Sequence, residues 1–111
     1  MDPQESKQDK VTRVARQVSG ALRKQARRKW DTVKTAERNE RGRHVWRFQS
    51  GPDQPERFLH VTHDALADGD DAAPVLLEQL KTGRWLDRLQ EGPETSLLLS
   101  RGGRLEAWPK H

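Results

Sequence analysis

Residues 9–38 read DKVTRVARQVSGALRKQARRKWDTVKTAER, and this stretch decides the fold class of the 111-residue chain. Its apolar residues recur at spacings of three and four, which places them on one face of an α-helix. The stretch therefore predicts a long helix over 9–38 within a basic segment at 9–42, with Asp9 as N-cap and Gly42 as stop. Residues 1–8 are expected to form a flexible tail. We define the apolar stripe of the predicted helix as Val11, Val14, Val18, Leu22 and Val33.

The positive charge of the chain is concentrated in the same region. Residues 1–43 carry a net charge of +7, whereas residues 44–111 carry −3. At 100° per residue, most of these cations lie away from the apolar stripe. A helix with one apolar and one cationic face can lie along phosphates, on an anionic membrane or against an acidic protein, or its charges can simply be solvated. The cations that we expect to contact phosphates are Arg13, Arg16, Arg23, Lys24, Arg27, Arg28 and Lys29.

Trp30 lies directly after this basic run. An indole in that position either stacks on a nucleic-acid base or anchors the helix to the rest of the domain. The sequence leaves both interpretations open, and we include Trp30 among the candidate binding residues.

The remainder, residues 44–111, predicts a small ββαββ domain. Strands are expected at His44–Gln49 and Glu56–Thr62, joined by a turn rich in Gly and Pro. In the first strand Trp46 and Phe48 face one way and Val45 the other, and in the second Phe58 and His60 lie opposite Leu59 and Val61. A helix follows from Asp71 to about Gln90, with a stop or kink at Gly83, and then a hairpin of Ser96–Ser100 and Arg104–Trp108. The expected fold is one α+β domain: a small antiparallel sheet with helices on one face.

Several kinds of chemistry have no support in the sequence. The chain has no cysteine, which excludes disulfides and Cys-ligated zinc. On a strand, His60 and His63 would point to opposite faces, so we expect no metal site. There is no phosphate-binding loop, nucleophile elbow or dinucleotide fingerprint, so we expect neither a cofactor nor an enzyme. No apolar run is long enough to span a membrane, and the first residues do not resemble a signal peptide, so the expected location is cytoplasmic.

Two functional hypotheses follow. The first is a non-catalytic nucleic-acid-binding module of low specificity that uses the basic helix. The alternative is a protein-interaction or assembly module, in which the apolar stripe pairs with another protein or with its copy in a homodimer. Salt separates them, because phosphate binding weakens steeply as salt rises and an apolar contact does not.

Overall fold

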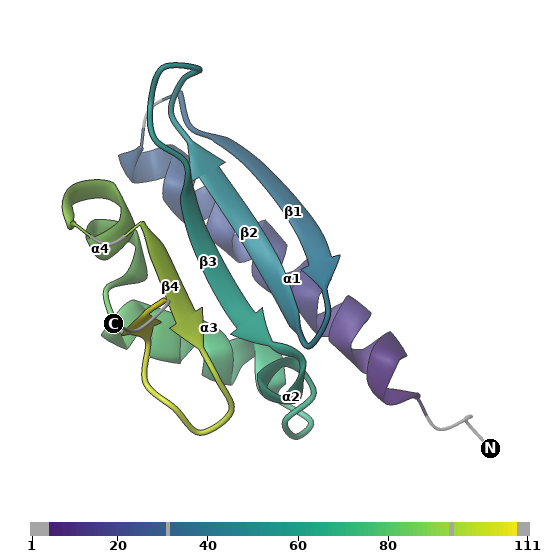
Figure 1. The fold of residues 1–111 in the computed structure, drawn as a ribbon. Coiled ribbons are helices and arrows are strands. Elements are labelled where there is room, and N and C mark those ends of the chain that lie inside the picture. Colours follow the sequence, from purple (N-terminus) through teal and green to yellow (C-terminus); the bar gives the residue numbers. More distant parts are fainter. Residues whose placement is uncertain (1–4, 31, 94, 109–111) are drawn as a thin grey trace.

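The computed structural model describes residues 5–30, 32–93 and 95–108. The chain is an α+β domain, as predicted, in which a long helix precedes a five-stranded sheet (Figure 1). In chain order the elements are α1 (Lys7–Lys29), β1 (Lys34–Glu40), β2 (Arg43–Gln49), β3 (Arg57–Thr62), α2 (His63–Leu66), α3 (Ala72–Thr82), α4 (Trp85–Glu91), β4 (Ser96–Leu99) and β5 (Glu106–Ala107).

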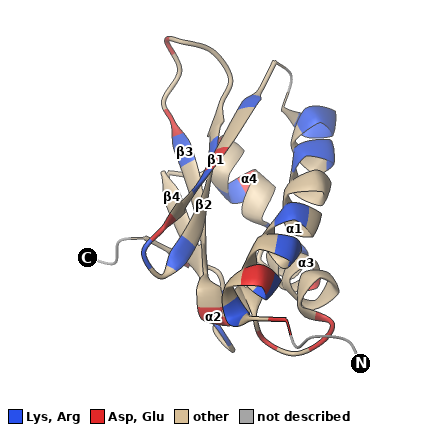
Figure 2. Ribbon diagram, turned by 90° about the vertical axis from the view of Figure 1, so that its right-hand side faces the viewer, with Lys and Arg blue, Asp and Glu red and all other residues tan. Residues whose placement is uncertain are grey.

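The helices α1, α3 and α4 all lie on one side of the sheet, as the edge-on view of Figure 2 shows. We call the opposite side the open face, and Figure 1 looks onto it. The strands follow one another in the order β1-β2-β3-β4-β5. The sheet is mixed rather than antiparallel, because β4 runs parallel to β3. The prediction was wrong at this pair because the helices between β3 and β4 carry the chain back along the sheet before β4 begins, which is the connection that parallel strands need.

Helix α1 is shorter than predicted. It begins at Lys7, where the Ser6 hydroxyl rather than Asp9 caps it by accepting the Asp9 N–H at 3.1 Å. Lys7 and Gln8, predicted as tail, are therefore helical, whereas residues 1–4 of that tail lie outside the described residues. The helix ends at Lys29, and Thr32 has a left-handed backbone with φ of 61°. Residues 34–38, predicted as the end of the helix, instead belong to β1, which pairs with β2 along its whole length.

The apolar stripe packs into the core of the domain. Val11, Val14, Val18 and Leu22 are buried, with Val18 and Leu22 fully enclosed. Val33 lies beyond the end of the helix, where it is partly buried against the same core. The helix is thus held to the sheet along its length, and its opposite side faces solvent.

A cluster of aromatic rings closes the core at the C-terminal end of α1. Trp30 stacks on Phe48 of β2 with ring centroids 6.2 Å apart and 18° between the planes. Phe48 in turn meets Trp85 of α4 at 5.3 Å. All three rings lie between the helices and the sheet, so Trp30 anchors α1 to the domain.

A buried polar contact fixes the other half of α1. The Trp46 indole donates a hydrogen bond of 2.7 Å to the Ser19 hydroxyl, which also contacts a carboxylate oxygen of Glu37. This contact joins α1, β1 and β2 at one point. A buried polar group needs a partner, so the contact favours one register between helix and sheet.

The predicted helix over residues 71–90 is two helices, α3 and α4, that meet at Gly83 and Arg84. Gly83 has ordinary helical backbone but lies against Leu105, and a Cβ built on it would come within 2.9 Å of the Leu105 Cβ. Arg84 is left-handed, with φ of 55°. The one-turn helix α2 was not predicted.

We expect Gly83→Ala to lower the free energy of unfolding by about 1–3 kcal/mol, because the added methyl overpacks the contact with Leu105. Gly20→Ala in α1 is the control, since a Cβ there meets nothing within 4 Å and Ala favours the helix by about 0.5–1 kcal/mol. Chemical denaturation of the two variants measures both effects. Equal stabilities for the two variants would contradict the tight packing at Gly83.

Stability should fall as the pH drops below 6.5. Burial lowers the pKa of His44 and of His60 from the ordinary 6.5, although Glu37 opposes the shift at His44 and Glu40 at His60. Just below pH 6.5 the unfolded chain therefore binds protons that the folded chain does not, and this stability is lost as the pH falls through the two lowered pKa values. Melting temperatures from pH 7.5 down to 5 measure the effect. His44→Gln with His60→Gln should flatten the profile over this range, and an unchanged slope would refute the assignment.

Candidate nucleic-acid interface

The outward side of α1 is a row of cations on a rigid helix. Spacings of seven and four residues return to the same side of a helix, so Arg16, Arg23 and Arg27 share one side of α1. At 100° per residue this side is opposite the apolar stripe. Gly20 lies in the same row between Arg16 and Arg23, and its position is open to solvent. Figure 2 shows Lys and Arg along the length of α1. From Arg16 to Arg27 the row spans about 16 Å at 1.5 Å per residue.

The structure divides the predicted phosphate-binding residues into paired and unpaired cations. Arg13 donates two hydrogen bonds of 2.9 Å to Glu5, and Lys29 lies 3.3 Å from Asp87. The Arg13 guanidinium, in turn, holds the pKa of Glu5 below its ordinary value. The other five are exposed and have no ion-pair partner within the described part of the chain: Arg16, Arg23, Lys24, Arg27 and Arg28.

Trp30 does not belong to this surface. It is only 9% exposed, and one face of its ring is occupied by Phe48. Of the two interpretations that the sequence left open, the structure places Trp30 as the anchor of the helix. Stacking of Trp30 on a base would require the aromatic cluster to open.

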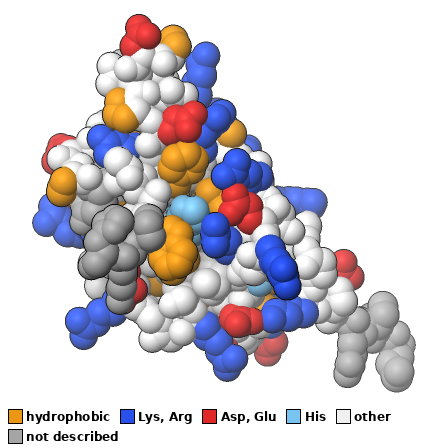
Figure 3. All heavy atoms as spheres, viewed as in Figure 1, with side chains coloured by type: hydrophobic (Ala, Val, Ile, Leu, Met, Phe, Trp, Pro, Cys, Tyr) orange, Lys and Arg blue, Asp and Glu red, His pale blue; other side chains and the backbone are white. Residues whose placement is uncertain are grey.

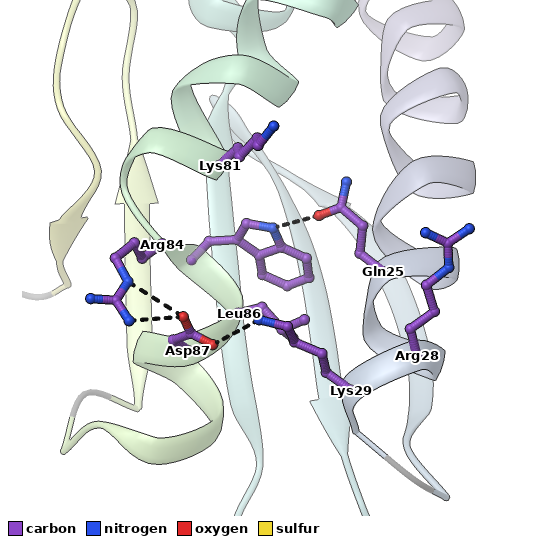
Figure 4. Close-up of a pocket in the computed structure, with 8 residues that line it drawn as sticks. Gln25, Arg28, Lys29, Lys81, Arg84, Leu86 and Asp87 are labelled. Carbon is purple, nitrogen blue, oxygen red and sulfur yellow. Dashed lines mark hydrogen bonds and ion pairs between the residues drawn. The ribbon is translucent and has the colours of Figure 1, made fainter.

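The basic surface continues past α1 into a pocket of about 250 Å³ that the sequence did not predict (Figure 4). Arg28 and Lys29 of α1 form one side, and Lys81 of α3 and Arg84 form the other. The Trp85 side chain also lines the pocket, and its indole N–H donates a hydrogen bond of 3.0 Å to Gln25. The pocket therefore joins cations from three parts of the fold.

One acid, Asp87, balances part of the charge in this pocket. It accepts hydrogen bonds from Arg84 at 3.1 and 3.3 Å and one from Lys29 at 3.3 Å, and these two residues hold its pKa below the ordinary value. Arg28 and Lys81 have no ion-pair partner among the described residues. The pocket thus keeps an excess of positive charge that suits a phosphate or another anion.

The apolar stripe, the basis of the alternative hypothesis, is not a free surface in this fold. Its first four residues are covered by the chain's own sheet and helices. Pairing through the stripe would require α1 to leave the domain.

No group of three or more His, Asp or Glu side chains is placed to hold a metal ion within the described ranges. The side chain of His63 lies at the start of α2, where its Nε2 is 2.6 Å from the Asn39 amide oxygen. None of the described helices is both long enough and apolar enough to cross a membrane.

Comparison of the chain with protein-family models, with curated proteins and with solved structures found no match.

Proposed function

We propose that this chain is a non-catalytic, low-specificity nucleic-acid-binding module that contacts phosphates through the outward side of α1. The observation that carries the proposal is the set of five exposed cations with no ion-pair partner among the described residues, on a helix whose other side is anchored in the core. If the cations of α1 were only solubilising charges balanced by the domain, acidic residues of the domain would be expected to pair with them. Most of the cations of α1 have no such partner among the described residues.

The geometry of the row suits a phosphate backbone. Successive phosphates of one strand are about 3.4 Å apart along the duplex axis, so a row of about 16 Å has the length of the axial rise over roughly five of them. The cations are held on one rigid helix, which lowers the ordering cost of binding. Arg and Lys that contact phosphates position a protein without reading the base sequence, which accounts for the low specificity.

The pocket beside Trp85 extends this surface. Arg28 is one of the unpaired cations of α1 and also lines the pocket, so a phosphate held there would continue the path of the backbone. An acidic protein is the second class of partner that such a surface could attract. Its carboxylates do not form the continuous line of negative charge that a phosphate backbone offers to the row on α1.

The unmodified chain should bind a fluorescein-labelled DNA duplex of mixed sequence at low salt. If five phosphates are neutralised, a plot of log affinity against log salt should have a slope of about −4.5. Fluorescence anisotropy over a series of salt concentrations measures the slope. An acidic peptide of equal charge serves as the comparison ligand. Absence of duplex binding at low salt, or tighter binding of the peptide, would refute the proposal.

A further inference from the structure

The open face of the sheet, on the side opposite α1, carries a second surface that the basic helix does not use. Strand alternation and register place the side chains of this face. Figure 3 views it directly and shows hydrophobic side chains around a histidine, with Lys, Arg and an acid beside them. Besides the rings and arginines described below, the register places two acids, Glu40 and Glu106, on this face.

Three rings form a continuous row across this face. Phe58 and His60 have ring centroids 6.4 Å apart, and His60 and Trp108 have centroids 6.5 Å apart. The two outer rings are partly exposed, while His60 between them is only 8% exposed. The row therefore offers two accessible rings with a polar group between them.

Two buried side-chain nitrogens lie beside this row. The Nδ1 of His60 and the Nε of Arg43 are buried, and neither has a hydrogen-bond partner among the described residues. The Arg43 guanidinium lies over the Trp108 ring, 5.9 Å from its centroid. Buried polar groups are normally satisfied, so these two nitrogens indicate a ligand with hydrogen-bonding groups.

Arginines border the rings on the β1 side. Arg38 and Arg43 share one acid, Glu40, at 2.6 and 2.9 Å, which leaves one positive charge unbalanced between them. A hollow of about 190 Å³ beside Phe58 is lined by Arg38, Arg47 and Glu37, and Arg47 is also paired with Glu56 at 3.3 Å. Cations thus flank the ring row and the hollow next to it.

We propose that the open face binds single-stranded nucleic acid, with bases stacked on Phe58 and Trp108 and phosphates on Arg38 and Arg43. Aromatic rings on a sheet can stack only on bases that are unstacked, which a single strand offers and a duplex does not. A base edge or a backbone oxygen reaches His60 Nδ1 and Arg43 Nε when the side chains that cover these nitrogens move aside. A second copy of the chain fits this face less well, because the arginines of the two copies would oppose one another at a buried interface.

The test compares a labelled single strand of about ten thymidines, a length within the range that such sites cover, with a duplex of mixed sequence. Phe58→Ala with Trp108→Ala should weaken single-strand binding about 20-fold or more and leave duplex binding unchanged. Phe58→Tyr with Trp108→Phe should retain most of the single-strand affinity, because it keeps both rings. Melting temperatures verify that each variant folds.

A photochemical crosslink keeps the proposal testable even if the alanine variant does not fold. A single strand containing 5-bromodeoxyuridine should crosslink to the unmodified chain within residues 57–62 or 105–108. Crosslinks confined to residues 7–29 would overturn the proposal and leave the α1 proposal standing. Single-strand affinity that is equal in the unmodified chain and a folded alanine variant would also overturn it. A third outcome would also overturn the proposal: the unmodified chain is a dimer, and Phe58→Ala with Trp108→Ala dissociates it without weakening single-strand binding. That result would assign the face to a second copy of the chain.

Discussion

Leu22→Asp is expected to abolish the cooperative folding of the domain. Leu22 is fully buried at the centre of the apolar stripe, where α1 meets the sheet. The substitution removes a leucine from the core, which alone costs about 2–5 kcal/mol, and adds the cost of an unpaired buried carboxylate. A domain of this size is typically stable by about 5–15 kcal/mol, so the total loss is comparable with the whole stability.

Thermal unfolding followed by circular dichroism measures this effect, and Gln17→Asp is the matched control. Gln17 lies on the exposed side of the same helix, so its substitution makes the same change of charge without burying it. We expect the control to melt near the temperature of the unmodified chain. If Leu22→Asp also kept that melting temperature, the packing of α1 would be contradicted. A dimer that became a folded monomer would instead favour assembly through the apolar stripe.

The start of this fold was predictable because its signal is local. The spacing of Val11, Val14, Val18 and Leu22 indicates a helix with one buried face, and the structure has that helix. The two hairpin strands at residues 43–49 and 57–62 show alternation of period two, which is equally local. The predicted facing of Trp46 and Phe48 opposite Val45 is confirmed by the burial of both rings between sheet and helices.

The errors in the fold arose where pairing between distant residues decides the structure. Lys34–Glu40 reads KTAERNE, which has neither helical nor strand periodicity of apolar residues. It is a strand because its backbone pairs with β2 at the edge of the sheet, where charged side chains are tolerated. The parallel pairing of β3 with β4 depends on the path of α3 and α4, and no local pattern encodes it.

The candidate surfaces show the same division. The sequence identified the cations of α1, but only the structure shows that Arg13 and Lys29 are paired whereas Arg16, Arg23 and Arg27 are not. Lys81 and Arg84 reach the pocket only because α3 and α4 fold back beside α1. For Phe58 and His60, alternation indicated that they share a side of their strand. This side is open because all the described helices that pack on the sheet lie on its other side.

The structure also limits how charge can act in this protein. The chain carries a net +4, and nonspecific attraction of DNA to any cationic protein would follow from that value alone. If α1 is the binding surface, the positions of the charges must matter as well as their sum. Two variants with the same net charge but different positions can separate these effects.

Replacing Arg16, Arg23 and Arg27 with Gln should therefore change the salt dependence of duplex binding far more than replacing Arg41, Arg101 and Arg104. Both triple variants lose three positive charges from exposed positions, but only the first set lies on α1. If three phosphate contacts disappear, the slope of log affinity against log salt should become less steep by about 2.7. Over a tenfold rise in salt, the unmodified chain should thus lose about 500-fold more affinity than the first variant. The second variant should keep nearly the original slope, because its arginines lie away from the row.

Anisotropy titrations of the three proteins on one duplex measure the slopes, and melting temperatures verify that all three fold. Equal slopes for the two variants would show that net charge alone attracts DNA, and the proposed role of α1 would be wrong.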